Sequence, residues 1–125
     1  MKRELILIVD DDPRGRKLIR DLLDVHGYTT VTTGNGVEAV ALAKERCPDL
    51  ILMDIQLPRM DGIAAMKALK SDPKTEGVPI IAITAHAMTG DEERLRSQGF
   101  DDFLAKPIDI HALLKRIRFY LHEEA

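Results

Sequence analysis

The chain has 125 residues, 45% hydrophobic and 31% charged, which is typical of one soluble domain spanning residues 1–125 with a core of its own. Its 18 basic and 21 acidic residues give a net charge of −3, which argues against a general affinity for nucleic acid. No apolar run is long enough for a membrane span or an export signal. The single cysteine, Cys47, excludes an internal disulfide, fits the cytoplasm, and is expected to be a small buried side chain.

The first predicted strand, Leu5–Val9, is a continuous apolar run that ends in three aspartates. Asp12 followed by Pro13 predicts the start of a helix, with Asp as the N-cap and Pro in the first turn. Gly27 is expected to end that helix in a left-handed conformation. The predicted inward face of the helix comprises Leu18, Ile19, Leu22 and Leu23.

The stretch Leu50–Asp54 is an apolar run closed by a single carboxylate. It follows a β-branched strand at 28–32, typical of a sheet edge, and a helix opened by the capping-box pair Asn35 and Glu38. Such an apolar run is typical of a central parallel strand that is covered on both faces. Asp54 is therefore predicted at the carboxyl end of the sheet, where open α/β sheets bind ligands.

Two further strands and three helices are predicted after Asp54. The strands cover Ile80–Ile83, closed by Thr84, and 100–105, closed by Lys106. The helix between them opens with the capping-box pair Thr89 and Glu92. It carries little apolar surface beyond Leu95, so it should be the least stable helix. The inward faces of the other two helices are predicted to be Ile63, Met66 and Leu69, and, after the cap Asp109, Ile110, Leu113, Leu114, Ile117 and Leu121.

Five strand–helix alternations predict an α/β fold, a doubly wound five-stranded parallel sheet with helices on both faces. Right-handed crossovers place the carboxyl ends of all strands at one edge. Four strand ends then bring together polar side chains, namely Asp10, Asp11, Asp54, Thr84 and Lys106.

These side chains favour phosphoryl chemistry on Asp54. Clustered carboxylates attract a hard cation such as Mg²⁺, while Lys106 and the hydroxyl of Thr84 can contact a phosphate. A carboxylate in that setting can attack phosphorus and form an acyl phosphate. Singly, each group has a structural explanation: Asp10 as a solvated strand end, Thr84 as a β-branched strand residue, Lys106 as a snorkelling side chain. These separate explanations do not account for all the groups following apolar strands in one domain, so the combination favours Asp54 as a phosphoacceptor.

Four motifs in order, ILIVDDDP, LILMDIQLPRMDG, ITAHAM and FLAKPI, resemble those of two-component response regulator receiver domains over essentially the whole chain. The resemblance implies the flavodoxin-like strand order 2-1-3-4-5 and a cis Lys106–Pro107 peptide. It implies phosphorylation of Asp54, direct binding of Mg²⁺ by Asp11, and binding through water by Asp10. The backbone carbonyl of Gln56 would be the third protein ligand.

The resemblance also implies a switch. Thr84 matches the switch hydroxyl, Phe103 the switch aromatic and Lys106 the phosphate-binding lysine. Phe103 has no hydroxyl, so its inward and outward positions would differ by packing alone. Gln56 and His86 occupy the variable positions that tune dephosphorylation.

The implied partners are a histidine kinase or histidine phosphotransfer protein and a downstream target protein, with no membrane insertion and a monomer or weak dimer. The stand-alone type is expected, because no residues are left for an output domain. The alternatives are a receiver from a larger hybrid kinase or regulator, and an aspartyl-nucleophile phosphatase, although Asp54-Ile55-Gln56 lacks the second aspartate of such enzymes. A receiver fold that docks without phosphorylation and a flavin-binding module are further alternatives. The intact site and the missing phosphate loop argue against them.

Overall fold

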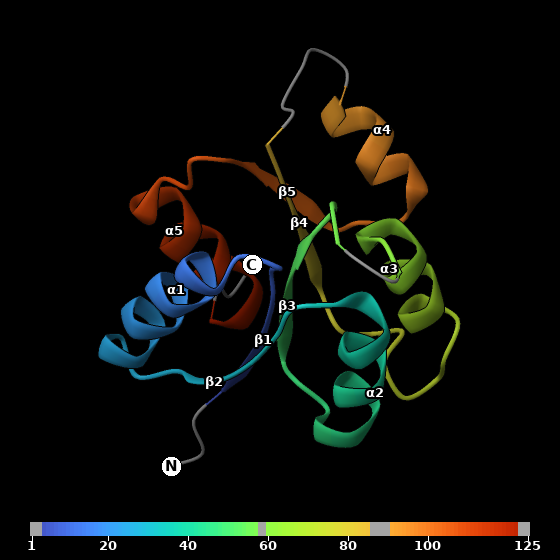
Figure 1. The fold of residues 1–125 in the computed structure, drawn as a ribbon, viewed down its shortest axis with the longest axis horizontal. Coiled ribbons are helices and arrows are strands. Elements are labelled where there is room, and N and C mark those ends of the chain that lie inside the picture. The colour runs from blue at the N-terminus through green and yellow to red at the C-terminus, as the bar shows by residue number, and fades with distance from the viewer. Residues whose placement is uncertain (1–3, 58–59, 86–90, 123–125) are drawn as a thin grey trace.

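A five-stranded parallel sheet in the order β2-β1-β3-β4-β5 forms the centre of the computed structural model (Figure 1). The structure describes residues 4–57, 60–85 and 91–122, the last without the side chains of residues 91 and 92. The predicted doubly wound parallel sheet and the strand order that the resemblance implies are both confirmed. The strands are β1 (Leu5–Val9), β2 (Thr29–Thr33), β3 (Leu50–Asp54), β4 (Ile80–Thr84) and β5 (Asp102–Ala105).

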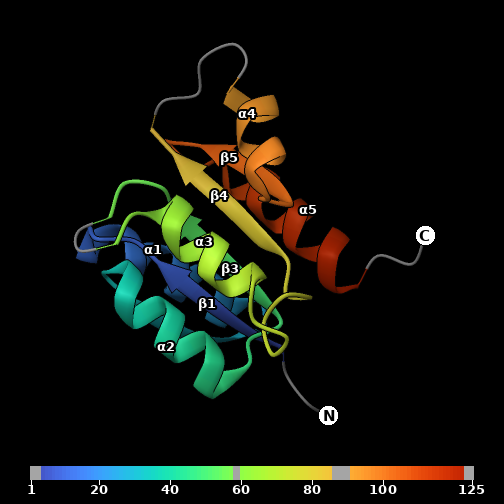
Figure 2. The same ribbon diagram turned by 90° about the vertical axis from the view of Figure 1, so that its right-hand side faces the viewer.

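Five helices cover the two faces of this sheet. Figures 1 and 2 show α1 and α5 on one face and α2 and α3 on the other, with α4 beside β5. Among the described residues, no helix is long and apolar enough to cross a membrane. The helices are α1 (Pro13–Val25), α2 (Gly36–Arg46), α3 (Gly62–Lys70), α4 (Asp91–Gln98) and α5 (Ile110–Leu121).

Alternate residues of the central strands enter two separate clusters of buried side chains. Ile6 and Leu52 pack toward α1 and α5, while Leu7 and Met53 pack toward α2 and α3. Side chains alternate between the faces of a strand, and both faces are covered here, so the strands are continuously apolar. A charged residue can therefore occur in such a strand only at its end, where the side chain reaches the edge of the sheet.

The predicted helix starts are confirmed where the structure describes them. The carboxylate of Asp12 accepts from the backbone N–H of Arg14, and the side chain of Asn35 from that of Glu38. The Glu38 carboxylate itself accepts from the Thr33 hydroxyl, so it serves the end of β2 rather than closing a capping box. The predicted cap at Thr89 lies outside the described residues.

Two side chains predicted to point inward are exposed instead. Leu18 of α1 is 65% exposed and Ile110, the first residue of α5, is 45% exposed. The apolar stripe of α1 is wider than its contact with the sheet, so the contact buries Ile19 and Leu23 and leaves Leu18 outside. The rest of the α5 prediction is correct for Leu113, Leu114 and Ile117, which are buried.

Cys47 is also exposed, contrary to the prediction. It occupies the C-cap of α2 with a φ of 49°, a left-handed conformation that turns the chain out of the helix. The Lys106–Pro107 peptide is cis and Gly27 has a φ of +90°, and these two predictions are confirmed.

Candidate functional site

The carboxyl ends of four strands converge at one edge of the sheet. Asp10 directly follows β1, and its backbone N–H donates to the carbonyl of Thr33 at 3.1 Å. Asp54 is the last residue of β3 and Thr84 the last of β4. Lys106 follows β5, and its backbone N–H donates to the carbonyl of Thr84 at 2.8 Å. The fold thus brings together side chains from distant parts of the sequence.

Three carboxylates form an acidic group at this edge. One oxygen each from Asp10, Asp11 and Asp54 lies within 4.8 Å of the other two. Asp10 and Asp54 are buried, while Asp11 faces solvent. Carboxylate oxygens at this spacing, with one side open to water, fit a hard cation such as Mg²⁺. Asp12 is excluded from the group because its carboxylate caps α1.

Lys106 supplies the positive charge of the site. Its Nζ donates to Oδ2 of Asp54 at 2.8 Å and lies 3.6 Å from Oδ2 of Asp10. Burial by itself lowers the pKa of Lys106, but the hydrogen bond to Asp54 and the charges of both carboxylates together raise it above its ordinary value. The ammonium group therefore stays charged at neutral pH, in contact with Asp54 and close to Asp10.

Burial is also the main influence on Asp10. It raises the pKa of this carboxyl above the ordinary value, and the nearby charge of Asp54 acts in the same direction. The N–H of Asp12 and the ammonium of Lys106 oppose the shift without cancelling it. The acidic group is therefore under electrostatic strain, which a bound cation would relieve.

Backbone contacts orient the Asp54 carboxylate. Its Oδ1 accepts from the backbone N–H of Gln56 at 3.0 Å, which leaves Oδ2 to Lys106. The start of α3 approaches so closely that a Cβ on Gly62 would lie 2.2 Å from the Asp54 carbonyl oxygen. Gly62 closes the motif LILMDIQLPRMDG, but the sequence did not reveal this contact, because it depends on the path of the loop.

Arg16 is another contact that the sequence did not reveal. Nη1 of Arg16 in α1 donates to the Asp10 carbonyl at 2.6 Å. A Cβ on Gly34 would meet the same nitrogen, so Arg16 fills the space between the end of β1 and the loop after β2. It steadies the backbone that presents the acidic group.

Thr84 and Phe103 lie on adjacent strands. Thr84 is 6% exposed, and its register partner on β5 is Ala105. Phe103 is paired with Ala82, is half-buried, and packs against the cluster on the α2–α3 face. His86 lies outside the described residues.

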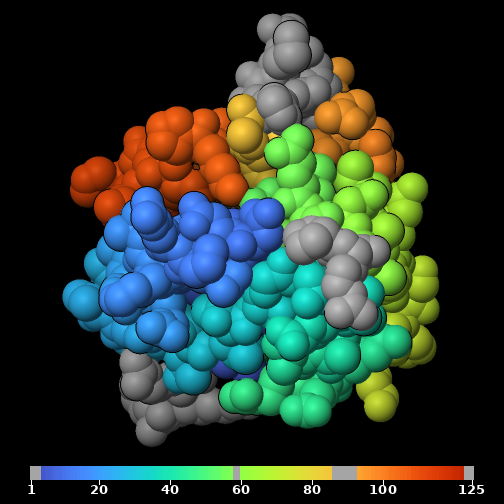
Figure 3. Space-filling view, viewed as in Figure 1, coloured from blue at the N-terminus to red at the C-terminus, as the bar shows by residue number. Residues whose placement is uncertain are grey.

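An apolar cavity of about 270 Å³ lies beside the site, between α1 and the segment that leads into α5. Asp10 and Lys106 line one end of it, and the exposed side chains Leu18 and Ile110 line it as well. In the space-filling view α1 adjoins α5 and the segment before it (Figure 3).

Comparison with known sequences gives a consistent result. Residues 6–118 match the family model for the response regulator receiver domain. The chain is 47% identical over 116 residues to the polar-differentiation response regulator DivK of Brucella anthropi, a match that covers 93% of this chain and 94% of that protein.

Solved structures with the same fold are also similar. The receiver domain of the sensor histidine kinase PA1611 from Pseudomonas aeruginosa PAO1, solved with magnesium coordinated in its active site cleft, has a TM-score of 0.89 and 34% identity. The match covers 98% of this chain and 100% of that one. Chemotaxis protein CheY4 of Vibrio cholerae has a TM-score of 0.89 and 28% identity, with 96% of this chain and 100% of that chain covered.

Proposed function

This chain belongs to the response regulator receiver domain family, and on that premise we propose that it accepts a phosphoryl group on Asp54 from a histidine kinase or histidine phosphotransfer protein. As a receiver it is typically a phosphoacceptor rather than an enzyme. The observation that supports Asp54 as the acceptor is that it lies next to both the other carboxylates and the lysine of the site. It belongs to the acidic group and is paired with Lys106 at 2.8 Å.

In the proposed reaction an Asp54 carboxylate oxygen attacks the phosphorus of a phosphohistidine. The P–N bond breaks as the new P–O bond forms, and the released imidazole nitrogen keeps the electron pair and takes up a proton. Lys106 moves from the carboxylate to a phosphoryl oxygen, and the hydroxyl of Thr84 donates to another. Lys106 already contacts Asp54 at 2.8 Å, whereas Thr84, at the end of the neighbouring strand, has to move toward the phosphoryl group.

We propose Asp10, Asp11, Asp54 and the backbone carbonyl of Gln56 as the Mg²⁺ site. When bound there, the ion would neutralise charge on the phosphoryl group as it is transferred. The same residues would assist the later loss of the phosphoryl group to water.

The proposed output is a change in protein contacts in the cytoplasm. Thr84 moves toward the phosphoryl group, Phe103 turns into the space beside β4, and the face built from α4, β5 and α5 changes shape. A phosphodonor protein would approach the site past Leu18 and Ile110, whose exposed apolar side chains flank Lys106. We propose a single receiver domain over 1–125 that acts as a monomer or weak dimer and contacts its target protein directly.

Acetyl phosphate with Mg²⁺ tests the acceptor assignment. The wild-type protein should gain one phosphoryl group by intact-mass measurement, and the Asp54→Asn variant should not. The Asp12→Asn variant is a matched control, because it removes a neighbouring charge, retains a good N-cap and leaves the acidic group whole. Equal labelling of the Asp54→Asn variant would refute the assignment. Steady turnover of a phosphate ester would favour the phosphatase alternative.

A further inference from the structure

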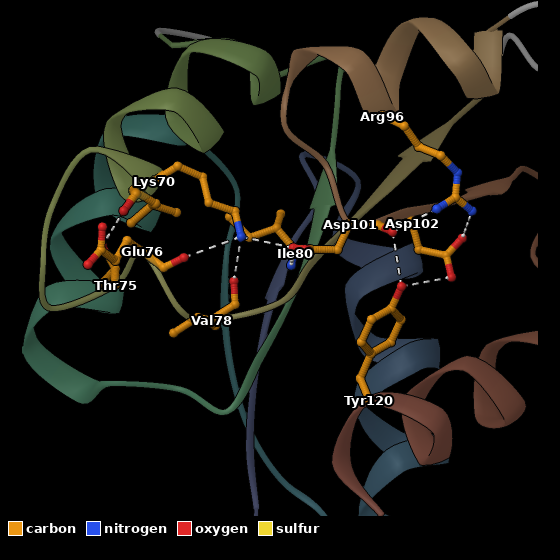
Figure 4. Close-up of polar contacts among 10 residues, drawn as sticks. Lys70, Thr75, Glu76, Val78, Ile80, Arg96, Asp101, Asp102 and Tyr120 are labelled. Atoms are coloured by element: carbon orange, nitrogen blue, oxygen red, sulfur yellow. Dashed lines mark hydrogen bonds and ion pairs between the residues drawn. The ribbon is translucent and has the colours of Figure 1, made fainter. Parts of the chain in front are cut away.

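One buried carboxylate joins two helices at the start of β5, away from the phosphoacceptor site. Asp102 has a side chain only 6% exposed. Its Oδ1 accepts from Nη2 of Arg96 in α4 at 2.9 Å and from Nη1 of Arg116 in α5. Its Oδ2 accepts from the hydroxyl of Tyr120, also in α5, at 3.2 Å. Figure 4 shows Arg96 and Tyr120 approaching the two neighbouring aspartates from opposite helices.

The start of β5 is held by several further hydrogen bonds. The neighbouring Asp101 carboxylate accepts from Nζ of Lys70 at 2.9 Å and from the backbone N–H of Ile80 at 2.8 Å, so the start of β5 is bonded to α3 and β4 (Figure 4). Tyr120 donates to the Asp101 carbonyl as well. Burial, followed by the charge of Asp102, raises the pKa of Tyr120 to about 12, so its hydroxyl stays a donor at any physiological pH.

The described side chains of α4 provide little apolar anchorage. Among the described side chains of α4, residues 93–98, Leu95 alone is buried. Arg96 provides a polar attachment of α4 to β5, because it donates to the Asp102 carboxylate and also, through Nη1, to the Asp101 carbonyl at 2.9 Å. A helix with so little apolar contact can change its position at a small cost in free energy, so the bonds of Arg96 can decide which position α4 adopts.

We propose that the Arg96–Asp102 ion pair is a latch that holds α4 in the resting position, the one in which Lys106 is paired with the Asp54 carboxylate. The proposal rests on the proposed function, since phosphorylation of Asp54 is the event that would break this ion pair. In the proposed switch Thr84 moves toward the phosphoryl group and α4 shifts with it, and the latch resists that shift. Because Asp102 keeps Arg116 and Tyr120 as partners, the latch can open without leaving a buried charge unpaired.

Linkage makes the latch measurable. A bond that is made only in the resting state weakens the binding of ligands that prefer the other state, by up to the factor by which it favours the resting state. Replacing Arg96 should therefore tighten the binding of a phosphoryl analogue without any contact to it. For a partly exposed ion pair the factor should be about twofold to fivefold.

The experiment measures the affinity of the Mg²⁺–beryllofluoride complex by fluorine NMR titration for the wild type, Arg96→Gln, Arg96→Lys and Arg118→Gln. Arg118 is exposed in α5 and provides a control with the same change of charge. The latch predicts tighter binding by Arg96→Gln, a smaller gain for Arg96→Lys, and wild-type affinity for Arg118→Gln. Hydrogen exchange without beryllofluoride should also show faster exchange in α4 for Arg96→Gln.

The outcomes separate the two claims. If the wild type binds beryllofluoride but Arg96→Gln binds no tighter than Arg118→Gln, the latch is wrong and the proposed function stands. If Arg96→Gln binds more weakly, Arg96 supports the phosphorylated state instead and the latch is again wrong. If the wild-type signal is unchanged by Asp54→Asn, the proposed function fails and the latch fails with it.

Discussion

At the scale of single residues, Asp10 shows how the site stores electrostatic strain. The carboxylate is 3% exposed, and burial together with Asp54 raises its pKa above the ordinary value of 3.8. A group whose pKa is higher in the folded state contributes most stability below its unfolded pKa. That contribution is lost as the pH rises through the folded pKa. Ionised Asp10 therefore costs folding free energy at neutral pH in the metal-free protein.

The Asp10→Asn variant should consequently be more stable than the wild type at neutral pH, by on the order of 1 kcal/mol. The amide oxygen can still accept from the N–H of Asp12, so the local turn is kept. The gain should shrink as the pH falls toward the ordinary carboxyl pKa of 3.8, because the Asp10 carboxyl of the wild type then becomes neutral, as the Asn side chain is. Urea unfolding in the presence of a chelator, at several pH values, measures this. A variant that is less stable than the wild type at neutral pH would contradict it.

The same strain predicts stabilisation by Mg²⁺. At a concentration ten times the dissociation constant, binding to the folded state should add about 1.4 kcal/mol. Asp11→Asn should lose most of that gain, because Asp11 is the proposed Mg²⁺ ligand on the solvent-facing side of the acidic group. Asp12→Asn should keep it, because Asp12 caps α1. Thermal unfolding over a Mg²⁺ series provides the measurement, and a wild-type melting temperature indifferent to the ion would count against the metal site.

At the scale of elements, local patterns located the strands and most helix starts. Continuous apolar runs mark strands covered on both faces, and the caps Asp12, Asn35 and Asp109 act within three residues of themselves. Burial on a helix was harder to predict. Leu18 belongs to the apolar stripe of α1, yet it is exposed, because the contact of α1 with the sheet is narrower than that stripe.

Close approaches between elements provide a further prediction. Gly62 begins α3, where Ala would ordinarily stabilise a helix by up to about 1 kcal/mol. Here a Cβ would lie 2.2 Å from the Asp54 carbonyl oxygen and 2.7 Å from Cα of Ile55. Gly62→Ala should therefore destabilise the protein by about 2–4 kcal/mol and disturb Asp54.

Gly77→Ala is the matched control for Gly62→Ala. A Cβ at Gly77 would meet nothing within 4 Å, so the substitution should change the free energy of unfolding by less than about 0.5 kcal/mol. Denaturant titration compares the two variants. A Gly62→Ala protein as stable as the wild type would show that α3 can shift away from the site at little cost.

At the scale of the whole molecule, topology explains why the sequence alone located so much of the site. Parallel strands with right-handed crossovers bring their carboxyl ends to one edge, so Asp10, Asp54, Thr84 and Lys106 could be grouped without coordinates. The contact of Arg96 with Asp102 could not be predicted. It depends on where α4 and α5 lie beside β5, and helix packing of that kind leaves no short-range pattern.

The site and the latch lie on opposite sides of one small structural unit, β4, α4 and β5. Thr84 ends β4 near the phosphoacceptor, and Arg96 bonds α4 to the start of β5. Phosphorylation should move this unit while the clusters around β1 and β3 stay packed, because those strands are buried on both faces.

Hydrogen exchange with and without Mg²⁺–beryllofluoride tests this account most directly. In the wild type, changes in protection should concentrate between Thr84 and Lys106, besides the loops that carry the acidic group. Asp54→Asn should abolish the changes, and Thr84→Ala should confine them to those loops. Changes restricted to α1, with β4, α4 and β5 unaffected, would contradict the roles given to Thr84, Phe103 and the latch.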